Sequence, residues 1–127
     1  MSRPDILVVE DDGATRDLLR MSLELEGYTV SLAANGAEGW QRLREAPPSL
    51  LVLDIMMPEM NGVELLGRIR GDPVLSSLPV IVVSALGALT SAAATLVDEY
   101  VPKPFDLDAL IATVARYCAA PVGSARP

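Results

Sequence analysis

The sequence predicts one α/β domain with a doubly wound (βα)5 fold, a five-stranded parallel sheet covered by helices on both faces. Three continuous apolar runs do not alternate with polar residues, which is typical of parallel strands buried on both faces. They are Ile6–Val9, Leu50–Leu53 and Val80–Val83. Segments with helical hydrophobic periodicity lie between them, and strands that alternate with helices form a mainly parallel sheet.

The first half of the chain carries the signals of two helices and an edge strand. The first helix is expected over Ala14–Glu26, with Gly27 as the residue that ends it. Tyr28–Ala34 alternates in part and is predicted to be an edge strand. A second helix is expected over Ala37–Glu45, and it ends before Pro47.

The second half is expected to hold a third helix over Val63–Arg70 and a last strand over Glu99–Val101. Pro102 follows that strand and has no amide hydrogen to donate, so the strand should be short. A final helix over Leu107–Cys118 begins after Asp106, which is a suitable N-cap.

The segment before the last strand is unusual, because it contains no charged residue from Pro73 to Val97. Residues 85–97 are small and apolar, and Thr90 or Ser91 is a candidate helix cap. A helix of about two turns is marginal by itself, so we expect a short or irregular fourth helix. The alternative is an exposed apolar patch that serves as a docking or dimer face.

A common strand order for such chains is 2-1-3-4-5, the flavodoxin-like arrangement, in which ligands bind beyond the carboxyl ends of strands 1 and 3. We adopt this order from the general rule, because the sequence does not establish it. The length of 127 residues suits one domain. We expect that domain over residues 1–119 and a flexible tail or linker stub over residues 120–127.

Composition excludes several classes of function. A net charge of −7 argues against direct binding to nucleic acid, which needs a basic face. No histidine is present, which excludes Ser/His and Cys/His nucleophile pairs and histidine-ligated zinc. Cys118 is the single cysteine, so no disulfide framework forms. No apolar run approaches the ~20 residues that cross a bilayer, and a cytoplasmic location is expected, with no membrane partner.

Acidic residues follow two strands that are neighbours in the expected order. Glu10, Asp11 and Asp12 end the first strand, and Asp54 ends the third. Their carboxylates should crowd one crevice, where like charges repel and raise each other's pKa. A divalent cation relieves this repulsion, and oxygen ligands suit Mg²⁺.

Ser84 and Lys103 follow the fourth and fifth strands and should face the same crevice. With a cation, one hydroxyl and one ammonium group, the site can neutralise the oxygens of a phosphoryl group. Each residue alone has an ordinary structural explanation, such as a solvated turn or a surface lysine. Their joint placement at four strand ends favours a functional site.

Over about residues 5–118 the chain resembles the receiver domain of two-component response regulators. The resemblance rests on ILVVEDD at 6–12, on LLVLDIMMPEMNG at 50–62 with VELL after it, on PVIVVSA at 79–85 and on KPF at 103–105. It implies a signalling module that receives a phosphoryl group from a phosphohistidine of a histidine kinase or a histidine phosphotransfer protein. By this resemblance the protein is no enzyme beyond catalysing its own phosphorylation and dephosphorylation.

The resemblance also assigns roles to the acidic residues. Asp54 would be the phosphoacceptor. Asp11 would ligate Mg²⁺ directly and Glu10 through water, and the backbone carbonyl of Met56 would be a further ligand. Asp12 falls outside the acidic pair and is expected to begin the first helix.

The remaining roles concern the phosphoryl oxygens and the switch. Lys103 would pair with the phosphoryl oxygens, and its bond to Pro104 would be cis. Ser84 takes the position of the switch hydroxyl and Tyr100 that of the aromatic switch residue. A homodimer through the face of helix 4, strand 5 and helix 5 is a further possibility that the family suggests.

Two apolar residues flank the phosphoryl position by the same resemblance. Met56 and Leu86 lie two residues after Asp54 and Ser84, and neither side chain can orient a hydrolytic water. We therefore predict slow autodephosphorylation; a half-life of seconds in the phosphorylated protein with Mg²⁺ would contradict this.

Three other classes of function remain open from the sequence. A phosphatase or phosphotransferase with an aspartyl nucleophile typically needs a second aspartate as general acid two residues on, where this chain has Met56. A flavodoxin-like cofactor binder needs an anion-friendly loop after strand 1, whereas EDDGATR at 10–16 repels phosphate. A receiver-like interaction domain that signals without phosphorylation is kept open by the unusual fourth helix.

Overall fold

Five parallel strands form the sheet of this protein in the order β2-β1-β3-β4-β5, which confirms the predicted topology. The computed structural model describes residues 5–55, 62–85, 87 and 89–118. Along the chain the elements are β1 (Asp5–Val9), α1 (Gly13–Leu25), β2 (Thr29–Ala33), α2 (Gly36–Glu45), β3 (Leu50–Leu53), α3 (Gly62–Gly71), β4 (Val80–Ala85), α4 (Ser91–Ala94), β5 (Glu99–Lys103) and α5 (Leu107–Cys118).

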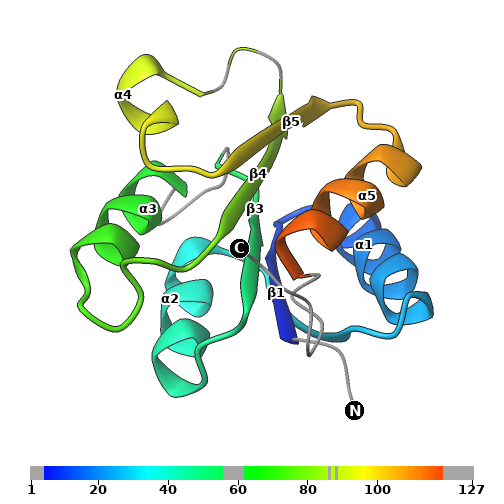
Figure 1. The fold of residues 1–127 in the computed structure, drawn as a ribbon, viewed down its shortest axis with the longest axis horizontal. Helices are drawn as coiled ribbons and strands as arrows, with labels where there is room; N and C mark the ends of the chain where they lie inside the picture. Colours follow the sequence, from blue (N-terminus) through cyan, green and yellow to red (C-terminus); the bar gives the residue numbers. More distant parts are fainter. Residues whose placement is uncertain (1–4, 56–61, 86, 88, 119–127) are drawn as a thin grey trace.

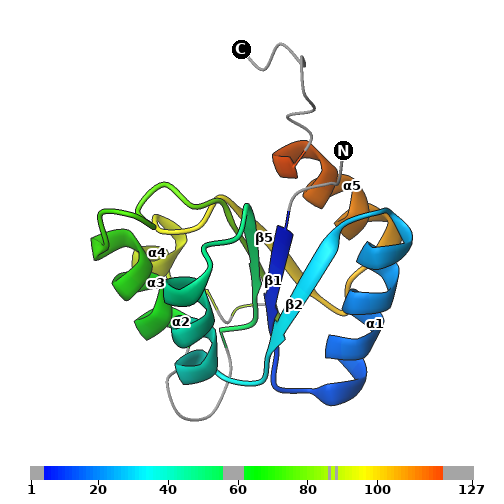
Figure 2. The same ribbon diagram turned by 90° about the horizontal axis from the view of Figure 1, so that it is seen from below.

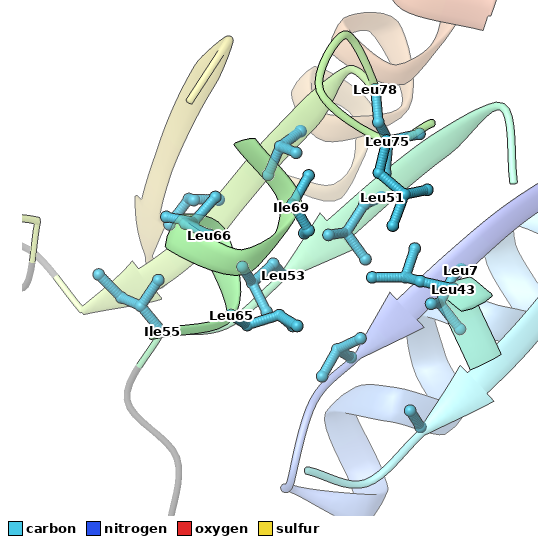
Figure 3. Close-up of a cluster of buried hydrophobic side chains, with 14 residues drawn as sticks. Leu7, Leu43, Leu51, Leu53, Ile55, Leu65, Leu66, Ile69, Leu75 and Leu78 are labelled. Atoms are coloured by element: carbon cyan, nitrogen blue, oxygen red, sulfur yellow. The ribbon is translucent and has the colours of Figure 1, made fainter. Parts of the chain in front are cut away.

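Helices cover both faces of this sheet, α1 and α5 on one side and α2, α3 and α4 on the other (Figures 1 and 2). Successive strand residues point to opposite faces, so β1 places Ile6 and Val8 in the cluster under α1 and α5, and Leu7 and Val9 in the other cluster. In Figure 3, Leu65 of α3 lies against the sheet beside Leu53 of β3. The continuous apolar runs are therefore explained by burial on both faces.

Local sequence signals define the helix ends. The side chain of Asp12 caps α1, and Asn35 and Thr90 cap α2 and α4. Asp106 accepts a hydrogen bond from the Asp108 amide at the start of α5, as predicted. Gly27, with φ of 96°, ends α1, since this left-handed conformation suits glycine.

The fifth strand is longer than predicted. β5 runs from Glu99 to Lys103, and Pro102 pairs in register with Ser84 of β4. The expectation that the strand ends at Val101 was wrong. β5 is an edge strand, and an edge strand can accommodate proline because one side of its backbone needs no partner in the sheet. The two added residues carry the strand to Lys103.

The fourth helix is short, as predicted. α4 comprises Ser91–Ala94 and begins after Thr90, whose hydroxyl accepts the amide hydrogen of Ala93.

Across residues 5–55, 62–85, 87 and 89–118, no helix has the length and apolar character to cross a membrane.

Candidate functional site

The sheet brings four predicted residues together at its carboxyl edge. Glu10 and Asp54 directly follow β1 and β3, and their amides still donate to neighbouring strands, to the carbonyl oxygens of Ala33 and Val9. Ser84 lies inside β4, and Lys103 is the last residue of β5. Glu10, Asp54 and Ser84 are 2%, 5% and 0% exposed, so the site holds buried polar groups in an otherwise apolar core.

Three carboxylates in this crevice can hold a metal ion. Glu10, Asp11 and Asp54 each offer an oxygen atom, and these three atoms lie within 4.8 Å of one another. Carboxylate oxygens are the ligands that Mg²⁺ and Ca²⁺ prefer. The donor set therefore fits a hard divalent cation, as the sequence predicted.

Lys103 and Ser84 contact the two oxygens of Asp54. The ammonium group of Lys103 lies 2.8 Å from Glu10 Oε1 and 3.3 Å from Asp54 Oδ2. The hydroxyl of Ser84 donates a hydrogen bond of 2.7 Å to Asp54 Oδ1. The Asp54 carboxylate thus has the Lys103 ammonium group beside one oxygen and the Ser84 hydroxyl beside the other.

Burial and the neighbouring charges shift the pKa values of Glu10 and Lys103. Burial raises the pKa of Glu10 to about 6, although the hydrogen bond from Lys103 opposes this. Burial alone would lower the pKa of Lys103, but its hydrogen bond to Glu10 and the charges of Glu10 and Asp54 raise it on balance. Lys103 therefore stays charged as the counter-ion of the two buried acids.

The turn from β1 to α1 holds the carboxylate of Glu10 and caps α1 through Asp12. Asp12 accepts hydrogen bonds from the amide and the hydroxyl of Thr15, which lower its pKa. The Asp12 amide donates to Glu10 Oε2 over 3.2 Å. Asp12 therefore caps α1 and lies outside the three-carboxylate cluster, as expected.

Sequence reasoning missed Arg16, which lies near the start of α1 and contacts this turn. Its Nη1 donates a hydrogen bond of 2.9 Å to the carbonyl oxygen of Glu10. The sequence contained a signal for this contact. An arginine near a helix N-terminus interacts unfavourably with the helix dipole, so such a residue is expected to have a compensating partner.

Of the remaining predicted residues, Tyr100 and Pro104 lie near the site, and two others lie outside the residues that the structure describes. Tyr100 donates its hydroxyl hydrogen to the carbonyl oxygen of Ala85, the residue after Ser84. The Lys103–Pro104 bond is cis, as the resemblance implied. Met56, the fourth proposed metal ligand, and Leu86 lie outside the described residues.

Comparison with known proteins gives a consistent result. The family model of the response regulator receiver domain matches residues 6–115. The chain is 44% identical over 123 residues to an uncharacterised 14.6 kDa protein of Leptolyngbya boryana, covering 94% of each chain. It is 42% identical over 110 residues to the response regulator MprA of Mycobacterium tuberculosis, covering 84% of this chain and 47% of that protein. The chain thus spans about half the length of MprA.

Solved structures share the fold. One is the response regulator protein TrrA from Thermotoga maritima in complex with Mg²⁺–BeF, with a TM-score of 0.82 and 33% identity over 92% of this chain and 99% of that chain. Another is the signal receiver domain of a histidine kinase from Syntrophus aciditrophicus, with a TM-score of 0.83 and 29% identity over 98% of this chain and 94% of that chain.

Proposed function

The chain belongs to the response regulator receiver domain family, and we propose that Asp54 is the residue that accepts a phosphoryl group. A receiver domain is a signalling module, and its state changes when it is phosphorylated. The donor we propose is a phosphohistidine on a histidine kinase or a histidine phosphotransfer protein. The family model and the curated response regulators support this class of partner.

The main support for this proposal is the pair of contacts made with the two carboxylate oxygens of Asp54. Lys103 and Ser84 contact different oxygens of this carboxylate, from the neighbouring strands β5 and β4. A phosphoryl group attached to either oxygen would meet a positive charge and a hydrogen-bond donor that are already in place. Such preorganised groups stabilise charge that develops during phosphoryl transfer.

The transfer step is a substitution at phosphorus. A carboxylate oxygen of Asp54 attacks the phosphorus atom, and a phosphorus–oxygen bond forms as the phosphorus–nitrogen bond of the phosphohistidine breaks. The electron pair of the broken bond returns to the imidazole nitrogen of the donor. Lys103 neutralises charge on the transferred oxygens, and the product is an acyl phosphate on Asp54. In this sense the domain catalyses its own phosphorylation.

We propose Mg²⁺ as the cation of the three-carboxylate cluster. Asp11 and Asp54 would ligate it directly, Glu10 would act through water, and the Met56 carbonyl would complete the protein ligands. When bound, Mg²⁺ supplies the positive charge that offsets both the acids and the incoming phosphoryl oxygens. The oxygen donor set and the Mg²⁺–BeF complex of TrrA support this choice.

Ser84 and Tyr100 are proposed to report phosphorylation to the surface. The Ser84 hydroxyl, which now bonds Asp54, can donate to a phosphoryl oxygen instead. Tyr100 bonds the carbonyl of Ala85, so a shift of the backbone at Ser84 and Ala85 reaches Tyr100 directly. This contact supports the pairing of the two residues in one switch.

A receiver-like domain that signals without phosphorylation gains no support from these contacts. Such a domain has no need for Glu10, Asp54, Ser84 and Lys103 to converge. Dimerisation through the face of α4, β5 and α5 stays a prediction. Sedimentation of the protein before and after treatment with acetyl phosphate would measure it.

Mass spectrometry tests the phosphoacceptor. The protein is incubated with Mg²⁺ and acetyl phosphate, and the intact mass is measured. We expect one phosphoryl adduct in the parent and none in Asp54→Asn. The matched control is Asp12→Asn, because asparagine caps helices as well as aspartate does and Asp12 lies outside the cluster. An adduct that persists in Asp54→Asn, or one that is lost in Asp12→Asn alone, contradicts the proposal.

A further inference from the structure

Arg16 is placed where a positive charge is costly. It follows Asp12, the N-cap of α1, by four positions, and the N-terminus of a helix carries a partial positive charge. It is also half-buried, and arginine loses side-chain entropy when it is held in one conformation. We therefore expect a contact that compensates for the unfavourable position of the charge and for the lost side-chain entropy of Arg16.

The contact is with the backbone of the acidic turn. Arg16 Nη1 donates to the carbonyl oxygen of Glu10 at 2.9 Å. Its Nη2 lies 3.6 Å from where a Cβ at Gly13 would be, so the guanidinium folds back over the first turn of its own helix. The side chain therefore reaches from α1 to the end of β1 and spans the turn that carries Asp11.

The Glu10 carbonyl belongs to the peptide that leads into Asp11. The amide of Glu10 is held by Ala33 of β2, and the amide of Asp12 by the Glu10 carboxylate. Asp12 is in turn held to Thr15 through its side chain. The hydrogen bond from Arg16 adds a fixed point on the peptide that precedes Asp11.

We propose that Arg16 is a positioning residue for the metal site: its hydrogen bond to the Glu10 carbonyl holds the turn so that the Asp11 carboxylate stays beside those of Glu10 and Asp54. The inference rests on the proposed function, because it concerns the same cation. Partners that orient metal ligands from outside the ligand set contribute about 10- to 100-fold to metal affinity. Arg16 acts one peptide away from a ligand, so we expect the lower end of that range.

Charge and positioning predict opposite results for Arg16, which makes the inference testable. Removing a positive charge close to a cation site should strengthen Mg²⁺ binding by electrostatics alone. Removing the hydrogen bond should weaken it by loosening the turn. If Arg16 only stabilised the fold, the melting temperature without Mg²⁺ would fall and the affinity for Mg²⁺ would not change.

The experiment measures Mg²⁺ affinity by titration, followed by the NMR shifts of the Asp11 and Asp12 amides at fixed pH and ionic strength. We expect the Kd of Arg16→Met to be about tenfold higher than that of the parent, and that of Arg16→Lys to lie closer to the parent. The matched control is Arg20→Met, which removes a charge one turn further along α1, where Arg20 pairs only with exposed Glu24 among the described residues. Its Kd should equal that of the parent.

An unchanged or lower Kd in Arg16→Met overturns the inference. If Arg16→Met does not fold, Arg16→Gln replaces it with the same expected direction. The mass measurement with acetyl phosphate distinguishes the two levels of failure. A parent that is phosphorylated and binds Mg²⁺, with a normal Kd in Arg16→Met, removes the role of Arg16 alone, whereas a parent that binds no Mg²⁺ removes the metal site as well.

Discussion

Two charged clusters at opposite ends of the sheet differ in how their charges are matched. At the amino end, the guanidinium of Arg70 donates to the carbonyl oxygens of Leu96, Ser76 and Leu78 and pairs with Asp98 at 3.1 Å. Asp98 also accepts the amide hydrogen of Val80, where β4 begins. At the carboxyl end, Glu10, Asp11 and Asp54 outnumber Lys103, which pairs with two of them.

The difference distinguishes a structural cluster from a binding site. The Arg70 cluster joins α3 to the segments that lead into β4 and β5, and its donors and acceptors are matched. The carboxyl-end cluster keeps excess negative charge in a mostly buried crevice, which costs stability unless a cation arrives. Removing an acidic charge such as that of Asp54 at the carboxyl end should therefore stabilise the protein, whereas removing the charge of Arg70 at the amino end should destabilise it, and only the carboxyl end should respond to Mg²⁺.

The largest expected effect is at the amino end. Arg70→Met leaves several acceptors without their donor, so we expect the free energy of unfolding to fall by about 3 kcal/mol. The loss should be the same with and without Mg²⁺ in chemical denaturation. Arg68→Met is the control on the same helix. Its partner Glu64 is exposed, and the expected loss is under about 1 kcal/mol.

The next effect tests the role of Lys103 as counter-ion. Lys103→Met leaves Glu10 and Asp54 without this positive charge, so without Mg²⁺ we expect a loss of about 2–3 kcal/mol, reduced from the buried-pair value because Lys103 is partly exposed. Saturating Mg²⁺ should raise the melting temperature of this variant more than that of the parent. An equal response in both proteins would show that Lys103 does not balance these acids.

A smaller effect appears in the pH dependence without Mg²⁺. Burial raises the pKa of Glu10 from 4.5 to about 6 in the folded protein, so the unfolded chain releases this proton first as the pH rises. The favourable contribution is complete below about pH 4.5 and is lost progressively up to about pH 6, in total about 2 kcal/mol. Denaturation of the parent and of Glu10→Gln across this range measures it. Plots of the free energy of unfolding against pH should differ in slope below about pH 6 and have the same slope above it. Plots that are parallel over the whole range would contradict the raised pKa of Glu10.

The smallest effect concerns Asp54. Asp54→Asn removes one of the three crowded carboxylates and keeps a side chain of the same shape. Without Mg²⁺ we expect it to stabilise the protein by about 1 kcal/mol, since relief of repulsion exceeds the loss of the contact with Lys103. Scanning calorimetry of both proteins measures the change in melting temperature. A lower melting temperature in Asp54→Asn would mean that the ion pair outweighs the repulsion.

The sequence was sufficient for the elements and for most of the candidate site. Continuous apolar runs identify three buried parallel strands, and Glu10, Asp54 and Ser84 directly follow these runs. Once the strand order is assumed, Glu10, Asp54, Ser84 and Lys103 must meet at one edge. Gly27, Asp12 and Asp106 likewise mark helix ends through bonds to residues close in the chain.

Only the tertiary structure decided how distant charges pair. Pro102 was expected to end β5 early, and its tolerance in the strand depends on which side of the sheet edge lacks a partner. The partners of Arg70 and the contacts of Lys103 with two acids are set by side chains that reach across the fold. Periodicity and capping are properties of neighbouring residues and can be read from the sequence. The pairing of charges depends on distances in space, which exist only after the chain has folded.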